Sequence, residues 1–292
     1  MAVAPQNQQG PSPVEPPFLP GGVQPKESNL WHLGRRAAPW LPPLAVIVAV
    51  LVTWEACTVV FDIPRWLLPS PAGIVRELLA SWAMFLSHTW ITLQETLLGF
   101  ALSLASGVLL SVLIAYSRTF ERSLYPFVIA SQTIPIIAIA PLLLIWLGYG
   151  VGPKVIVVAL IAFFPIVVNT VDGLKSADND MINMMRTLGA NKWQIFTKVQ
   201  VPTSLPFLFS GIRVAVAVSV IGAVIGEWVG SSQGLGYLMI RSKAQFLTER
   251  VFAAIFILSL MGIGLFLMVG LVERYVIPWH GRERRMIALE EG

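Results

Sequence analysis

The sequence is poor in charged residues, and this scarcity excludes an ordinary soluble domain. Asp, Glu, Lys and Arg make up 12% of its 292 residues, whereas about a quarter of the residues in a soluble domain are charged. Hydrophobic residues make up 55% of the chain. This composition is typical of a protein that crosses a membrane several times.

Cysteine and histidine are scarce as well. The single cysteine, Cys57, excludes an intramolecular disulfide and a Cys-rich metal site, and we expect it to pack as a small hydrophobic residue. The histidines, His32, His88 and His280, lack the spacing of metal ligands. No arrangement of catalytic groups stands out, and no basic stripe with interleaved aromatic residues indicates nucleic acid binding. We therefore expect no metal, no catalytic residue and no nucleic acid partner.

Six apolar runs are long enough to cross a lipid bilayer, which predicts an all-α membrane protein with six transmembrane helices. A shorter amphipathic helix is expected along the membrane surface, from Ile74 to about Phe85. Residues 1–40, rich in Pro, Gln and Gly, predict a disordered tail, and residues 281–292 predict a second tail. The apolar runs cover residues 44–61, 90–116, 124–147, 154–171, 205–228 and 252–272.

The basic residues predict the orientation of these spans. With six spans, both ends of the chain, the 117–124 loop and the 172–206 segment share one side of the membrane and carry thirteen Lys and Arg residues, against six on the other side. Because basic residues concentrate on the cytoplasmic side, both termini and the 172–206 segment are expected to face the cytoplasm.

Residues 172–206 form the longest polar interval after the N-terminal tail, and their pattern predicts a helical hairpin. Met181, Met184, Met185 and Leu188 recur at helical spacing and predict one apolar stripe. Gly189 is a candidate C-cap. Asn191 and Gln194 have the spacing of a cap that starts a second helix, and Pro202 is expected to end it. The stripe requires burial against the chain's own loops, the bilayer surface or another subunit, and these alternatives remain open.

Polar residues within the apolar runs are candidates for a translocation path. Gln132 precedes two prolines, which predicts either a broken helix lining the path or a packing kink. Asn169 is expected to form a hydrogen bond across helices, and a substrate contact is the alternative. Glu227 predicts either a gate residue or an anchor for the turn from Gly230 to Gly236. Arg213 is expected to snorkel or to pair locally.

The hairpin resembles the coupling segment of bacterial ABC importer permeases, whose pattern is E-A-A-x-x-x-G followed by I-x-L-P. The similar residues run from Arg186 to Phe196 and from Val199 to Pro202. Gly189 and Pro202 match the fixed Gly and Pro of this pattern. Residues 183–185, Asn-Met-Met, stand where it has Glu-Ala-Ala, so the docking face should be more apolar and less salt-sensitive than the pattern suggests.

Further stretches resemble the permeases of the nitrate, sulfonate and taurine group, and the resemblance extends over about residues 40–280. They are Pro135 to Gly148, Phe164 to Thr170, Gly211 to Arg213 and Glu227 to Tyr237. The sequence from Leu235 to Ser242 is more similar to permeases for vitamins or pyrimidine precursors, such as riboflavin or a thiamine precursor, than to those for sulfonates, taurine or nitrate.

This resemblance implies the type I ABC importer permease fold in a bacterial inner membrane, with a permease domain over residues 41–280. It implies a homodimer or a pseudo-dimer, an extracytoplasmic substrate-binding protein and two cytoplasmic ATPase subunits that bind ATP and Mg. The chain has no G-x-x-x-x-G-K-[ST] phosphate loop, so ATP hydrolysis is assigned to those subunits and the chain is not expected to be an enzyme. The residues expected to dock on the ATPase are Met181, Met184, Met185, Leu188, Gly189, Ala190, Trp193 and Pro202.

Two other classes of membrane protein predict patterns that can be compared with this sequence. A secondary transporter driven by an ion gradient should show a symmetric hydropathy repeat and several intramembrane acids or histidines. A membrane enzyme should show catalytic groups clustered at one membrane depth. Neither pattern is evident in the sequence.

Overall fold

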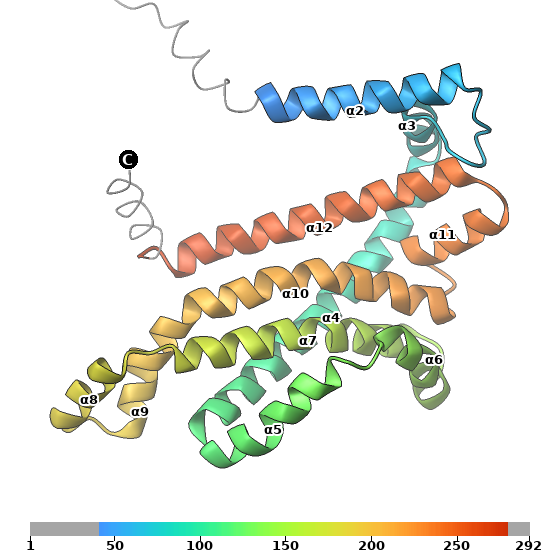
Figure 1. The fold of residues 1–292 in the computed structure, drawn as a ribbon. Helices are drawn as coiled ribbons and strands as arrows, with labels where there is room; N and C mark the ends of the chain where they lie inside the picture. Colours follow the sequence, from blue (N-terminus) through green and yellow to red (C-terminus); the bar gives the residue numbers. More distant parts are fainter. Residues whose placement is uncertain (1–40, 280–292) are drawn as a thin grey trace, which may run out of the picture. The chain divides into compact units, whose positions relative to one another are not determined.

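The computed structural model describes residues 41–279, and those residues form helices joined by short loops, with no strand among them (Figure 1). The predicted tails, and with them His32 and His280, lie outside the described residues. The chain forms two separate units, one ending at Val52 and the other starting at Thr53. The packing described below is that within residues 53–279. The helices are α2 (Leu41–Val60), α3 (Pro71–Ala80), α4 (Trp82–Tyr116), α5 (Arg118–Ser131), α6 (Ile136–Leu147), α7 (Val151–Lys175), α8 (Asn179–Thr187), α9 (Lys192–Ile195), the π-helical turn η2 (Phe196–Gln200), α10 (Val201–Gly230), α11 (Leu235–Ala244) and α12 (Thr248–Val276).

Five helical runs are long and apolar enough to cross a membrane. They are α2, α4, α7, α12 and the 39-residue run from Lys192 to Gly230. The predicted third span is divided: α5 and α6 are separated by a break of four residues and bent by 99°. Pro135 caps the start of α6, which explains the break, because proline disfavours helical backbone at the preceding residue. Residues 41–279 therefore form an all-α membrane fold with five continuous spans and one bent pair.

Helices α4, α7 and α10 form the centre of the bundle. Small residues of α4 at four-residue spacing, Gly99, Ser103, Gly107 and Ser111, are all buried. A Cβ atom added at Gly99 would overlap the side chain of Val158 on α7, so the two helices approach too closely for any larger residue there. Such close packing fixes the register of α4 against α7.

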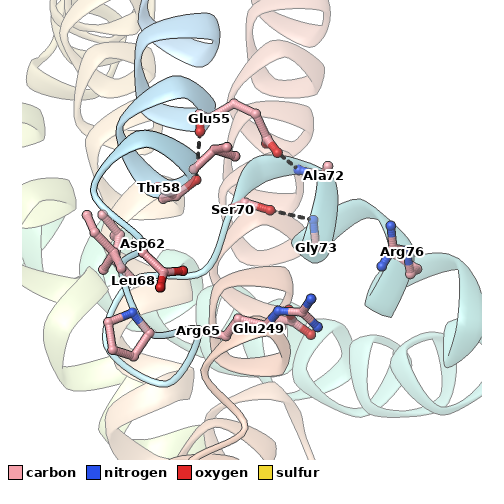
Figure 2. Close-up of a pocket in the computed structure, with 13 residues that line it drawn as sticks. Glu55, Thr58, Asp62, Arg65, Leu68, Ser70, Ala72, Gly73, Arg76 and Glu249 are labelled. Atoms are coloured by element: carbon pink, nitrogen blue, oxygen red, sulfur yellow. Dashed lines mark hydrogen bonds between the residues drawn. The ribbon is translucent and has the colours of Figure 1, made fainter.

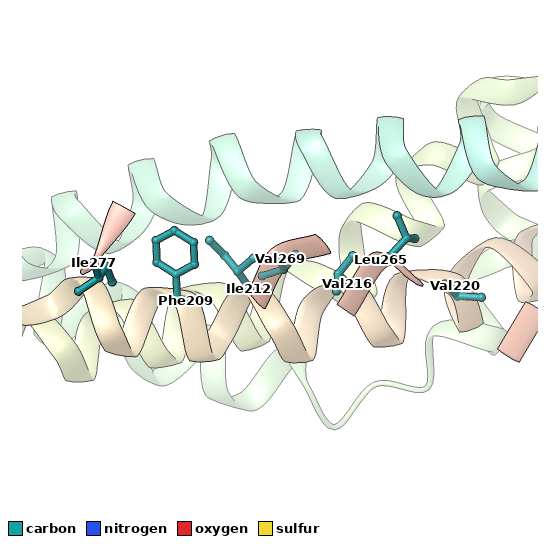
Figure 3. Packing of buried hydrophobic residues seen from close by; sticks show 7 residues of the cluster. All are labelled: Phe209, Ile212, Val216, Val220, Leu265, Val269 and Ile277. Atoms are coloured by element: carbon teal, nitrogen blue, oxygen red, sulfur yellow. The ribbon is translucent and has the colours of Figure 1, made fainter. Parts of the chain in front are cut away.

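Helix α12 packs on α10 through an apolar seam. Figure 3 shows Phe209, Ile212, Val216 and Val220 of α10 beside Leu265 and Val269 of α12. Arg213 pairs with Glu273 of α12 near the same seam, which is the local pair that the sequence indicated. The ion pair gives the seam one polar contact at the hairpin end of α10.

Two segments differ from the sequence predictions. The amphipathic helix ends at Ala80 rather than near Phe85, because Ser81 closes α3 and α4 starts directly after it. The interval between the last two spans contains α11, which was not predicted. Helix α11 buries Leu235 and Leu238 against Phe85 and the start of α12, and this tertiary contact explains a helix with little amphipathic pattern of its own.

Candidate functional site

The hairpin is built by local capping, as the sequence predicted. Asp178 caps α8 by accepting a hydrogen bond from the Asp180 amide at 2.8 Å. Gly189 has φ +81°, the left-handed conformation that favours glycine. Asn191 and Gln194 form a reciprocal capping box with hydrogen bonds of 2.9 Å and 2.8 Å. These contacts lie within a few residues of one another, so the hairpin shape follows from its own sequence.

The apolar stripe of the hairpin is exposed. Leu188 is 74% exposed, Met184 57% and Met181 48%, while Met185 is half-buried. Trp193, 62% exposed, stacks on Phe196 with ring centroids 5.7 Å apart, and the neighbouring Ala190 is half-buried. No residue of α8 is buried by any other part of residues 41–279. Burial of the stripe against the chain's own loops is therefore not what the structure shows.

The second helix of the hairpin continues into the membrane, and the prediction that Pro202 ends it is wrong. Helix α9 passes through the π turn η2 directly into α10, with Pro202 in the first turn of α10. The Val201 amide donates to the Phe196 carbonyl, the wider hydrogen bond of a π turn. Proline is tolerated within this continuous helix because the wider π turn directly before it accommodates a residue that has no N–H.

Two of the three predicted path residues make no contact that defines a site. Gln132 is exposed and lies in the break between α5 and α6. Asn169 donates a 2.8 Å hydrogen bond to the Pro165 carbonyl of its own helix, so the expected bond across helices is not formed. Its Cβ instead lies against Gly211 of α10. Gln132 therefore lies at a broken helix, one of its two predicted alternatives, whereas Asn169 contributes to the packing of α7 on α10.

Glu227 lies in a buried polar network that ties α10 to α4. Its side chain is 1% exposed. One carboxylate oxygen accepts a 2.6 Å hydrogen bond from Thr92 Oγ1, and the other accepts from the Gly236 amide. The Leu235 amide donates to Thr92 Oγ1 at 2.8 Å. This is the contact that the anchoring alternative requires, because Glu227 holds the end of the turn that follows α10.

A second pair of ionisable residues completes the network. Lys154, in the first turn of α7, forms a buried ion pair with Glu95 of α4 and donates to Ser231 Oγ at 3.0 Å. Glu95 lies about one helical turn from Thr92 on α4, the residue that donates to Glu227. The sequence did not single out either residue as a site, although Glu95 lies within the second apolar run and Lys154 begins the fourth. The signal that would have found them is the cost of burying a charge without a partner.

Two cavities lie at the end of the bundle away from the hairpin. One of about 550 Å³ opens beside this network and is lined by Tyr149, Gly150, Lys154, Gly230, Ser231 and Ser232. The other, of about 470 Å³, lies between the end of α2, α3 and the start of α12. Figure 2 shows charged residues of both signs around it, and the Glu55 carboxylate accepts from the Ala72 amide at the start of α3.

Comparison with known proteins places this architecture among transport proteins. Residues 107–278 match the family model described as "Binding-protein-dependent transport system inner membrane component". The formylaminopyrimidine transport permease protein ThiX of Halalkalibacterium halodurans is 42% identical over 250 residues, which cover 85% of this chain and all of that protein. The riboflavin transport system permease protein RibX of Chloroflexus aurantiacus is 39% identical over 236 residues, covering 80% of this chain and 88% of that protein.

Among solved structures, a chain of the MetNI methionine ABC transporter in an inward-facing conformation superposes with a TM-score of 0.60. The sequences are 19% identical, and the match covers 68% of this chain and 98% of that chain. At this identity the likeness concerns the fold.

Proposed function

The chain belongs to the binding-protein-dependent transport system inner membrane component family and is the permease subunit of an ABC importer, and from this premise we propose how it works and what it carries. Two copies of the chain form the path for a vitamin or pyrimidine precursor. Each copy docks its hairpin on one of two cytoplasmic ATPase subunits, and those subunits bind ATP and Mg. The family implies association with an ATPase and a binding protein, whereas the pairing of identical copies is part of the proposal.

The observation that supports docking is the exposed stripe of the hairpin. Met181, Met184 and Leu188 present a contiguous apolar surface on a helix that buries none of its residues within the described chain. Methionine is flexible and fills irregular gaps, which suits an interface that changes as ATP binds and leaves. A groove of a partner subunit is the occupant that fits a short amphipathic helix with anchors at i, i+3 and i+7.

The continuous helix offers a route from this surface to the membrane. The run from Lys192 to Gly230 has 39 residues, so it extends over about 58 Å at the rise of an α-helix. Buried Ile195, Phe196 and Val199 fix its hairpin end to the bundle. A movement of the ATPase subunits is therefore applied directly to α10 rather than to a loose loop.

The distribution of basic residues supports the proposed orientation, and the names of two relatives support the proposed substrate class. The excess of thirteen basic residues over six supports a cytoplasmic hairpin and cytoplasmic termini. Two relatives, at 42% and 39% identity, are named for formylaminopyrimidine and riboflavin, and both compounds are nitrogen heterocycles. We assign this solute class to the chain in preference to sulfonates, taurine or nitrate.

The proposal is tested by uptake into proteoliposomes that contain the permease, its ATPase and its binding protein, with riboflavin and formylaminopyrimidine as probes. Uptake should require ATP and all subunits. Gly189→Val places a β-branched residue at φ +81°, a strained conformation. We expect ATP hydrolysis to continue while uptake is lost.

Gly264→Val is the control. A Cβ atom at Gly264 meets open space, as at Gly189, but the residue lies within α12 rather than in the hairpin. This variant should retain normal coupling between hydrolysis and uptake. Uptake by the permease alone without ATP would overturn the importer assignment, and unchanged uptake by Gly189→Val would overturn the coupling role of the hairpin.

A further inference from the structure

We propose that Glu95 determines which solutes enter, by neutralising Lys154 at the wall of the 550 Å³ cavity, so that the cavity admits uncharged, hydrogen-bonding ring compounds and disfavours anions. This inference rests on the proposed function, because it concerns the solute of the same importer. It assigns roles to Glu95, Lys154 and Thr92, none of which the sequence singled out.

The cavity has the size and position of an entry site. Its volume of about 550 Å³ lies within the range typical of small-molecule sites. Its walls are the loop before α7, the first turn of α7 and the turn after α10. Gly230, the α10 residue that lines the cavity, follows Val201 by 29 residues of helix, so the cavity lies about 44 Å from the hairpin end of α10. With the hairpin in the cytoplasm, the cavity opens toward the side from which solute arrives.

The charge of the wall is set by one ion pair. Lys154 is the one charged residue among the described residues that line the cavity. Its ammonium group is paired with Glu95 and donates to Ser231 Oγ at 3.0 Å, and the two side chains are only 8% and 1% exposed. A buried ammonium with its carboxylate partner presents little net charge to a solute. The wall therefore offers hydroxyl groups, backbone amides and the Tyr149 ring, which suit a neutral heterocycle.

Ser231, which accepts a hydrogen bond from Lys154, is held in place by the same network. Three successive amides of the following turn donate to side chains: Gly234 to His88 Nδ1 at 2.9 Å, Leu235 to Thr92 Oγ1 at 2.8 Å, and Gly236 to Glu227. Each of these bonds is buried or partly buried, so breaking one leaves a backbone amide without its partner. Thr92 and Glu227 are accordingly positioning residues for the cavity wall.

The chain offers a direct probe of cavity charge, because Cys57 is its single cysteine. In the complete permease and ATPase complex, Cys57→Ser with Ser232→Cys places one thiol at the exposed edge of the cavity. The rate of modification by an anionic reagent, sulfonatoethyl methanethiosulfonate, is divided by the rate with its cationic trimethylammonium analogue. This ratio rises when the local charge becomes more positive, and it requires no solute.

The variants should change this ratio in a pattern set by Lys154. Glu95→Gln keeps the shape and frees the Lys154 charge, so the ratio should rise about tenfold, the effect of one charge-assisted interaction. Lys154→Met removes the ammonium group, and the buried Glu95 carboxyl without its partner is then neutral, so the ratio should stay near the parent value. The double variant should also lack the rise. Thr96→Val, a buried hydroxyl whose hydrogen bond stays within α4, is the matched control and should leave the ratio unchanged.

A second arm tests selectivity with two solutes that share a ring. Equilibrium dialysis of the same complex with riboflavin and riboflavin 5′-phosphate should show preference for riboflavin in the parent protein and a shift of about tenfold toward the phosphate in Glu95→Gln. Thr92→Val should lower binding of riboflavin, and Thr92→Ser should restore it, since serine keeps the hydroxyl.

The two arms separate the possible failures. An unchanged reagent ratio in Glu95→Gln overturns the inference, whatever the solute, as does a rise that persists when Lys154→Met is added. If neither flavin binds while the ratio responds as expected, the charge assignment stands and the proposed solute class is wrong. If Glu95→Gln does not accumulate in membranes, Glu95→Ala replaces it in the same test, because it also leaves the Lys154 ammonium without a carboxylate partner.

Discussion

Leu188 should contribute a large share of the affinity between the hairpin and its ATPase partner. It is 74% exposed, more than any other residue of the stripe, so docking has the most surface to gain there. Replacing leucine by alanine removes three carbon groups, which are worth about 2.4 kcal/mol if fully buried. If docking covers the 74% of the side chain that is now exposed, Leu188→Ala should lose about 1.8 kcal/mol of binding free energy, which is roughly a 20-fold weaker Kd.

The same reasoning gives Met184→Ala a loss of about 1.4 kcal/mol, since that side chain is 57% exposed. The two positions share one stripe, so the double variant sets an upper bound of about 200-fold. The affinity is measured by titrating the ATPase subunit onto the permease in nanodiscs. Thr187→Ala, at an exposed position off the stripe whose hydroxyl bonds to the Asn183 carbonyl of its own helix, should bind like the parent.

Salt provides an independent check on the character of this interface. Asn183 stands where the related pattern has a glutamate, and it accepts a hydrogen bond from Arg186 on the same helix at 3.4 Å. With an apolar stripe and no acid at that position, affinity should change less than about threefold between low and high salt. Two results would refute the reasoning: an affinity within twofold of the parent in Leu188→Ala, or a steep loss of affinity as salt rises.

Two other predictions concern the bundle itself. Gly99→Leu should prevent close packing of α4 on α7, because even a Cβ atom at Gly99 overlaps Val158. The variant should therefore have a lower melting temperature and lose monodispersity in detergent. Gly264→Leu is the control, because a Cβ atom there meets open space. Arg213→Glu and Glu273→Arg should each destabilise the α10–α12 seam and the combined swap should recover most of the lost melting temperature; failure of the swap to recover any stability would assign the effect to packing rather than to the ion pair.

Local sequence was sufficient to predict the hairpin caps and the membrane spans. The Asn191 and Gln194 box and the positive φ of Gly189 depend on residues within one helical turn, and the spans depend on the apolar length that a bilayer requires. The resemblance to importer permeases was confirmed by the family match. The ends of the spans were less predictable, because helices continue into polar residues beyond the apolar runs.

The buried network could not be predicted in the same way. Thr92 and Glu227 are 135 residues apart, and Glu95 and Lys154 are 59 apart, so their meeting depends on the register of α4, α7 and α10. That register is set by close contacts such as Gly99 against Val158, which a single sequence does not display. The error at Pro202 has a different cause. Proline usually ends a helix, but here the preceding π turn accommodates it.

The π turn at Phe196–Gln200 sets the direction in which the docking surface faces around the axis of α10. A π turn contains about one residue more than an α turn, and each helical residue advances the chain by about 100° around its axis. The hairpin is therefore rotated by roughly a quarter of a revolution from the direction that an uninterrupted α-helix would give it. Deleting one residue within this turn would restore a regular helix and re-aim the stripe, while every span kept its own sequence. The rotation of the helix at this π turn, and not the composition of the hairpin alone, therefore decides which way the docking surface faces the partner.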